Sequence, residues 1–181
     1  MHANPKIHVC DSLRRHIAPA TLRALSRRIR RAAARLHIDD EALATLGVRI
    51  VDDREMAALH LRFMGESGPT DVLSFAGEFT GEGPSLGDLA IDWQAVQRQA
   101  PVKSPAGFLD EATLLAVHGL AHLLGHDHRD AAEGRRMHQQ ERRVLRALGV
   151  ADQPRPYARR LLRSPEDREP EPKQEQESAH D

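Results

Sequence analysis

Four histidines lie within the short stretch VHGLAHLLGHDH, which runs from Val117 to His128. His118 and His122 are four positions apart, so on a helix their side chains share one face, with Cβ atoms about 5–6 Å apart. That separation lets two imidazoles bind one metal ion. Gly125 follows them, and glycine readily adopts the left-handed conformation that ends a helix and turns the chain back.

The predicted turn would bring a third histidine to the same ion. His126 and His128 compete for this role on sequence alone, and packing of the chain against the helix end favours His128. Three neutral imidazoles with one open position are typical of a catalytic zinc site. The sequence therefore predicts one zinc ion per chain, held by His118, His122 and His128, although three histidines also suit nickel or another divalent ion. Asp127 is expected either to orient a ligand histidine or to cap a local turn.

A glycine stands where a zinc peptidase carries its general base. The spacing of His118, His122, Gly125 and His128 matches the pattern H-E-x-x-H-x-x-G-x-x-H, in which the glutamate takes a proton from the metal-bound water. Gly119 occupies that glutamate position and has no proton acceptor. Peptidase chemistry is therefore disfavoured, and we expect the glycine to leave an open gap beside the metal for a bulky substrate.

The elements that position these histidines follow from hydrophobic periodicity and turn residues. An apolar-rich helix over about Leu109–Leu124 carries the histidine motif. Other helices are expected over Pro19–Leu36, from an N-cap at Asp53 to about Arg62, over WQAVQRQA, and over Ala131–Leu148, and strands over Lys6–Cys10, Leu46–Asp52, Thr70–Gly77 and Asp88–Asp92. The segment EFTGEGPSLG is expected to be a loop or a hairpin. We expect one α+β domain, in which a mixed sheet of about four strands packs against helices and the metal-carrying helix lies in the core.

Charge separates a folded domain from a tail. The segment Arg163–Asp181 holds three basic and seven acidic residues, three prolines and almost no apolar side chains, so we expect it to be disordered. Residues 1–162 then form the domain, which is mildly basic. Arg23, Arg27, Arg30 and Arg31 lie off the apolar stripe of their predicted helix, and such a run is either a solvated face or a surface that binds phosphates.

Composition excludes several other classes of protein. The single cysteine, Cys10, allows no internal disulfide and no thiolate-pair metal site. Aromatic residues make up only 3%, which weakens the interpretation as a platform on which single-stranded bases stack. No apolar run approaches the roughly 20 residues of a membrane span, and the start lacks the layout of a signal peptide. We expect a cytoplasmic protein with no membrane partner.

The stretch HGLAHLLGHDH resembles the motif H-G-x-x-H-L-x-G-x-D-H of the YbeY family of bacterial ribosomal RNA maturation factors. Two further segments, PTDVLSF (Pro69–Phe75) and LGDLAID (Leu86–Asp92), resemble segments of that family in the same order and spacing, and the resemblance covers about Ile7–Leu148. It implies a zinc-dependent endoribonuclease specific for single strands, acting in 3′-end maturation of small-subunit ribosomal RNA and in ribosome quality control. It also implies ribosomal subunits or ribosomal proteins as partners, and leaves the oligomeric state open.

The chain departs from the family ahead of PTDVLSF. The family commonly reads L-N-x-x-Y-R there, and its arginine is taken to face the RNA; His60, Phe63 and Met64 replace the asparagine, tyrosine and arginine. Methionine cannot bind phosphate. We expect His118 and a substituting Arg62 to act in catalysis; otherwise phosphate contact has moved to other basic residues, or activity is weakened.

The sequence leaves two questions open. The attacking group is water or the ribose 2′-hydroxyl, and three carboxylates near the motifs, Asp71, Asp88 and Asp127, are candidates for the general base. The alternative function is a non-catalytic, zinc-bearing ribosome assembly or binding factor. The basic helix and the lost arginine fit that alternative.

Overall fold

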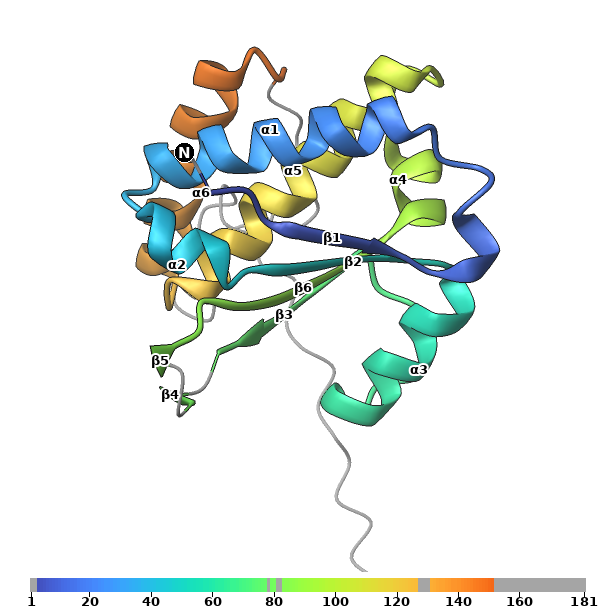
Figure 1. The fold of residues 1–181 in the computed structure, drawn as a ribbon, viewed down its shortest axis with the longest axis horizontal. Coiled ribbons are helices and arrows are strands. Elements are labelled where there is room, and N and C mark those ends of the chain that lie inside the picture. Colours follow the sequence, from blue (N-terminus) through green and yellow to red (C-terminus); the bar gives the residue numbers. More distant parts are fainter. Residues whose placement is uncertain (1–2, 78, 81–82, 127–130, 152–181) are drawn as a thin grey trace, which may run out of the picture.

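The structure is a computed structural model that describes residues 3–77, 79–80, 83–126 and 131–151. Figure 1 shows a sheet with helices on both of its faces. The strands are β1 (Lys6–Val9), β2 (Gly47–Val51), β3 (Val72–Ala76), β4 (Phe79–Thr80), β5 (Gly83–Pro84) and β6 (Gly87–Asp92). The helices are the 3-10 turn η1 (Asp11–Leu13), α1 (Pro19–Arg35), α2 (Asp40–Ala44), α3 (Asp53–Met64), α4 (Trp93–Gln99), α5 (Pro105–Leu123) and α6 (Ala131–Leu148).

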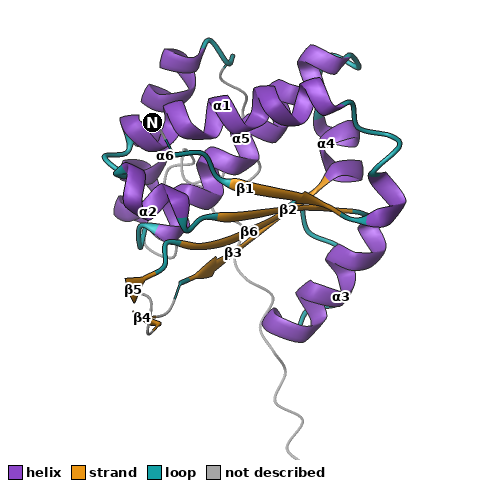
Figure 2. Cartoon of the chain, viewed as in Figure 1, coloured by secondary structure: helices purple, strands orange, loops and turns teal. Residues whose placement is uncertain are grey.

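The main sheet has four strands in the order β1-β2-β6-β3. β1, β2 and β6 run parallel, whereas β3 pairs antiparallel with β6, for example Leu73 with Ala90 and Ser74 with Leu89. β4 and β5 form a separate antiparallel pair within the segment predicted as a loop or hairpin. The prediction of an α+β domain with a mixed, four-stranded sheet is therefore confirmed (Figure 2).

The two faces of the sheet are covered by different helices because alternate strand residues point to opposite faces. Leu89 and Ile91 of β6 belong to the large core that contains residues of α1 and α5. Ala90, between them, belongs to a smaller core with Leu73 of β3 and Met56 of α3. α5 therefore lies on one face of the sheet and α3 on the other (Figure 1).

The helix that carries the histidine motif is held in the core, as predicted. Most of its residues from Glu111 to Ala121 are buried, and they pack between the sheet and α1. Arg28 of α1 also reaches Asp110 at 2.5 Å and Thr113 at 3.3 Å. The backbone of this helix is thus fixed by apolar packing on two sides and by an ion pair.

Two helix starts differ from the sequence prediction and one short helix was not predicted, and a side-chain cap accompanies each of the three. α5 begins at Pro105, because the Ser104 hydroxyl accepts the backbone N–H of Gly107 at 3.1 Å and proline suits the first helical turn. The N-cap of α3 is Asp52, not Asp53, since Asp52 accepts the N–H of Glu55. The short helix α2 was not predicted, although Asp39 caps it in the same way.

Candidate metal centre

Two imidazoles converge near the C-terminal end of α5. The Nε2 atoms of His118 and His122 lie 3.2 Å apart, and the two rings are nearly perpendicular at 89°. Two nitrogens that each bind a tetrahedral zinc ion at about 2.0–2.1 Å must lie about 3.3 Å apart. The observed separation therefore fits two ligands of one ion.

A buried glutamate fixes the orientation of His118. Oε1 of Glu141, on α6, lies 2.6 Å from Nδ1 of His118, and the two side chains are only 5% and 11% exposed. A carboxylate accepts hydrogen bonds, so Nδ1 carries the proton and Nε2 keeps its lone pair for a metal. His122 faces that same lone pair, which means that Glu141 prepares the imidazole on the side where the two rings meet.

Sequence reasoning missed Glu141, although a signal was present. Glu141 lies on the apolar stripe of α6, together with Met137, Val144 and Leu145, all of which are buried. A charged residue at a core position of an amphipathic helix calls for a buried partner, because an unpaired buried charge is costly. The sequence gives no means of identifying that partner, which is 23 positions away.

The turn after α5 forms as predicted. Gly125 has φ 83°, and its N–H bonds to the His122 carbonyl at 2.9 Å, while the N–H of His126 bonds to the Ala121 carbonyl at 3.1 Å. This pair of bonds is the Schellman motif, which ends a helix with a left-handed residue. The turn therefore ends the helix shortly after His122, the second histidine of the pair.

The third ligand stays a prediction. His128 and the neighbouring Asp127 lie outside the residues that the structure describes. Within the described ranges, no group of three or more histidine, cysteine, aspartate or glutamate side chains gathers in a way that could hold a metal ion. The assignment of His128 rests on its spacing from the turn at Gly125.

The expectation about Gly119 is wrong. Gly119 faces the sheet and is buried there, and a Cβ atom on it would lie 2.7 Å from Cδ2 of Leu89 and 3.2 Å from Oγ of Ser74. The Ser74 hydroxyl also donates to the Gly119 carbonyl at 3.3 Å. The glycine thus allows a close contact between α5 and the sheet and opens no gap for a substrate. A glutamate at this position would point into the core.

Arg62 lies apart from the histidine pair in this structure. It is exposed on the last turn of α3, with its guanidinium 5.2 Å from the centre of the Phe63 ring. α3 covers the sheet face opposite α5, so the described contacts do not bring Arg62 to His118. Met64 is 49% exposed at the end of the same helix. The catalytic role of Arg62 stays a prediction.

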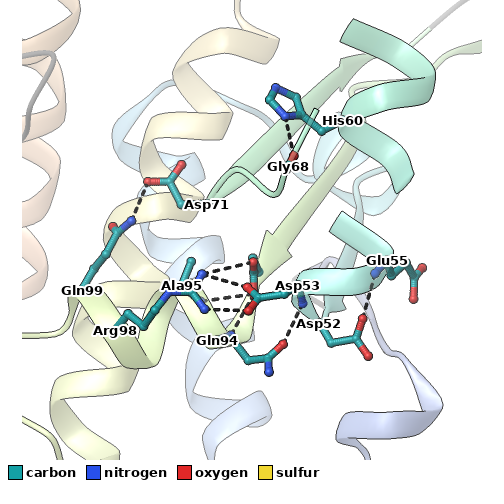
Figure 3. A network of polar contacts seen from close by, with 11 residues as sticks. Asp52, Asp53, Glu55, His60, Gly68, Asp71, Gln94, Ala95, Arg98 and Gln99 are labelled. Atoms are coloured by element: carbon teal, nitrogen blue, oxygen red, sulfur yellow. Dashed lines mark hydrogen bonds and ion pairs between the residues drawn. The ribbon is translucent and has the colours of Figure 1, made fainter. Parts of the chain in front are cut away.

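The other two departures from the family pattern have structural roles. His60 bonds through Nδ1 to the Gly68 carbonyl at 2.9 Å, and its Nε2 lies 3.3 Å from Glu66, so it ties the loop after α3 back to the helix (Figure 3). Phe63 packs edge-on against Phe75, with ring centres 4.9 Å apart. Both contacts hold the connection that leads into β3.

Two of the three candidate bases have been located. The Asp71 carboxylate accepts a hydrogen bond from Gln99, at the end of α4, at 3.2 Å (Figure 3). Asp88 precedes Leu89 in β6 and points to the opposite face, where it lines an apolar groove of about 360 Å³ with Phe63 and Phe75. Asp88 therefore faces away from α5, and the role of Asp71 as general base stays a prediction.

A pair of carboxylates, the buried Asp92 and the partly exposed Asp53, joins the N-terminal ends of α3 and α4. Asp92 is fully buried, and its Oδ1 accepts the N–H groups of Gln94 at 2.8 Å and Ala95 at 3.2 Å. Arg98 makes two bonds to Asp53, at 2.7 and 2.8 Å (Figure 3). Burial and, after it, the neighbouring Asp53 together raise the pKa of Asp92 to about 7, whereas the Arg98 guanidinium lowers the pKa of Asp53. These contacts connect α3 to α4.

The described helices include none with both the length and the apolar character needed to cross a membrane. This is the structural finding that bears on the expectation of no membrane partner. Cys10 is buried and makes no disulfide.

The sequence comparisons with known proteins agree on one family. The family model described as endoribonuclease YbeY matches residues 10–149. Relatives of that name include one from Chelativorans sp. (strain BNC1), 40% identical over 145 residues that cover 78% of this chain and 86% of the relative. Another, from Halorhodospira halophila, is 42% identical over 64% of this chain and 75% of its own length. A solution structure, TM1509 from Thermotoga maritima, aligns with 82% of this chain and 96% of its own at 18% identity, with a TM-score of 0.47. On the sequence matches, the chain belongs to the endoribonuclease YbeY family.

Proposed function

We propose that this chain is a zinc-dependent endoribonuclease that cleaves single-stranded RNA. Membership of a family named for endoribonuclease activity supports the reaction. The convergence of the His118 and His122 Nε2 atoms, at 3.2 Å, is the observation that supports dependence on a metal. The same membership disfavours the alternative of a non-catalytic ribosome-binding factor.

The donor set suits zinc. His118 and His122 would hold the ion together with His128, which the spacing of the motif assigns. Zinc bound there would supply Lewis acidity for a phosphoryl oxygen and would lower the pKa of a bound water to about 7. The three-histidine set would leave one position open, as catalytic zinc sites require.

The chain's own residues prepare this site in two ways. Glu141 keeps the proton of His118 on Nδ1, so the Nε2 lone pair points at His122. Ser74 and Leu89 hold the backbone of Gly119 against the sheet, so the helix turn that carries both histidines cannot shift toward the strands. Phosphate binding falls to Arg62 or to another basic residue, because Met64 offers no donor.

We further propose that the substrate is ribosomal RNA, with 3′-end maturation of the small-subunit RNA and ribosome quality control as the roles. Ribosomal subunits or ribosomal proteins are the proposed partners and the cytoplasm the location. These proposals are supported by the three motif segments around His118, Pro69 and Leu86, since their order and spacing match the family pattern.

The decisive experiment is cleavage of a labelled single-stranded ribosomal RNA fragment by zinc-loaded protein, beside the variants His118→Ala and Met64→Arg. We expect the wild type to cut and His118→Ala to be inactive. Faster cleavage by Met64→Arg would show that the replaced arginine limits the rate. Products carrying a 2′,3′-cyclic phosphate would identify attack by the 2′-hydroxyl.

Two outcomes would overturn the proposal. Absence of cleavage in every lane, with zinc bound, would favour the non-catalytic ribosome-binding factor. Cleavage that survives His118→Ala at full rate would show that the histidine pair is not the active centre.

A further inference from the structure

One face of α1 carries a row of arginines that the proposed active centre does not use. Arg23, Arg27, Arg31 and Arg35 recur every four residues, and all four are exposed. With a rise of about 1.5 Å per residue, successive members are about 6 Å apart along the axis, and the row spans about 18 Å. The row is thus a line of positive charge along one helix.

This row has few negative neighbours. The chain contains no aspartate or glutamate between Ser12 and Ile38. Within the described part of the chain, Arg28 pairs with Asp110, but Arg23, Arg27 and Arg35 make no ion pair. Like charges four residues apart destabilise a helix, so the row costs stability in the free protein. A bound polyanion would remove that cost.

The C-terminal end of α6 extends the row. A terminal guanidinium nitrogen of Arg31 donates to the Ala147 carbonyl at 3.2 Å, which places the last turn of α6 beside α1. Arg143 is one helical turn before Ala147, and both Arg143 and Arg146 are exposed. We call these six exposed arginines the basic face: Arg23, Arg27, Arg31, Arg35, Arg143 and Arg146.

The opposite side of α1 decides which kind of polyanion fits. Leu25, Ile29, Ala32 and Ala33 are buried in the main core, where α1 packs on α5. An amphipathic helix that binds a membrane surface must present its apolar face to the lipid. The apolar face of α1 is already used within the protein. The basic face therefore offers charge without apolar anchors, which suits a phosphate backbone.

We propose that the basic face is a docking surface for the phosphate backbone of RNA outside the segment being cleaved. The choice of RNA as the polyanion rests on the proposed function. The charge and geometry of the basic face are observed independently of that function. The row lies on the side of α1 away from α5, so it binds a part of the RNA that is remote from His118 and His122. It supplies affinity without reading sequence, as phosphate contacts do.

The test measures binding apart from cleavage. Full-length protein carrying His118→Ala binds fluorescein-labelled single-stranded polyuridylate across a series of salt concentrations. Arg23→Gln with Arg27→Gln removes two charges of the row, and glutamine keeps a similar helix propensity. Lys6→Gln with Arg54→Gln is the control, because it removes two exposed charges from β1 and α3. Arg28 and Arg31 are left intact, since both make contacts within the protein.

We expect the α1 variant to bind more weakly at low salt, with the slope of log K against log[salt] reduced by about 1.4, or about 0.7 for each lost phosphate contact. The control should keep the parent slope. Equal losses in both variants, or no loss in the α1 variant, would overturn the proposal. Binding to phosphatidylserine vesicles that is lost in the α1 variant while RNA binding is unchanged would also overturn it. Because cleavage is never measured, a failure here is distinct from a failure of the proposed nuclease activity.

Discussion

Two acidic side chains, Glu141 on α6 and Asp92 at the end of β6, are similarly buried but have different hydrogen-bond partners. Glu141 bonds to an imidazole whose second nitrogen points at another imidazole. Asp92 bonds to two backbone N–H groups at the start of α4 and lies against Asp53, which Arg98 holds. Glu141 orients an imidazole that can bind a ligand. Asp92 makes structural contacts, to the backbone at the start of α4 and to Asp53.

Burial alone does not identify a carboxylate that serves a binding site. Burial and a shifted pKa mark Asp92, yet its partners are structural. Glu141 is distinguished by its partner, because the second ring nitrogen of His118 lies 3.2 Å from Nε2 of another histidine. A search for sites by buried charge alone would therefore select both clusters. Substitutions at the two carboxylates should have different effects on zinc affinity and on the pH dependence of stability.

His122→Ala should abolish stoichiometric zinc binding, because it removes one of the two nitrogens that converge. The metal-dependent part of the stability should be lost with it. Zinc content by elemental mass spectrometry, together with melting curves with and without zinc, measures both effects. Unchanged zinc content would mean that the ligands have been assigned wrongly.

Glu141→Gln should weaken zinc binding by about 10- to 100-fold while leaving the chain folded, because an amide is a poorer acceptor for the Nδ1–H of His118 and makes the imidazole a weaker ligand. Competition against a zinc-binding dye gives the affinity, and far-ultraviolet circular dichroism reports the fold. Glu133→Gln, at an exposed position of the same helix, is the matched control. Equal zinc affinity in both variants would leave Glu141 with a structural role only.

Asp92→Asn should change how stability depends on pH and leave zinc affinity alone. The pKa of Asp92 is raised in the folded state, so its ionisation opposes folding, and the wild type should lose stability as pH rises from about 4 to about 7. The slope approaches about 1.4 kcal/mol per pH unit within that window. Asparagine keeps an oxygen for the N–H groups of Gln94 and Ala95 and cannot ionise, so this slope should vanish.

Urea unfolding across that pH range measures the free energy of unfolding for both proteins. Asp53 titrates in the opposite sense, because its lowered pKa contributes stability that is lost only as the pH falls below its ordinary range. The two contributions are therefore separated along the pH axis. A parallel pH profile in wild type and Asp92→Asn would contradict the account of this cluster.

Deletion of Arg163–Asp181 should have the smallest effect. The segment has almost no apolar residues with which to pack, so the melting temperature should change little. Thermal unfolding of the shortened chain beside the full chain measures this. A large drop would show that the tail contributes to the folded domain and that the boundary after residue 162 is wrong.

The sequence predicted the elements well where a single local rule governs them. The apolar stripe of Leu25 and Ile29 predicted α1, and Gly125 predicted the end of α5. Both signals depend only on residues that are close together in the sequence. The cap of α3 was misassigned by one residue, since Asp52 and Asp53 are equally suited to the role by type. Only the fold shows that Asp53 is used by Arg98.

The part of the site that could not be predicted depends on contacts between distant segments. Glu141 meets His118 only because α6 packs on α5, and Ser74 meets Gly119 only because β3 is antiparallel to β6 at the edge of the sheet. No spacing rule connects such pairs. The same limit explains the wrong expectation for Gly119. The sequence does not show that Leu89 of β6 and Ser74 of β3 fill the space that the absent side chain leaves.

The contact of Gly119 with Leu89 ties the position of the proposed zinc ligands to the packing of the hydrophobic core. A bulkier or differently branched residue at position 89 would push α5 away from the sheet, and both imidazoles would move together, so that their mutual distance would survive while the distance to Glu141 on α6 changed. Substitutions at 89 or 74 that look conservative by polarity would then alter metal affinity without touching any ligand. Positions 74 and 89, which contact Gly119, should accordingly tolerate fewer substitutions than other positions of β3 and β6.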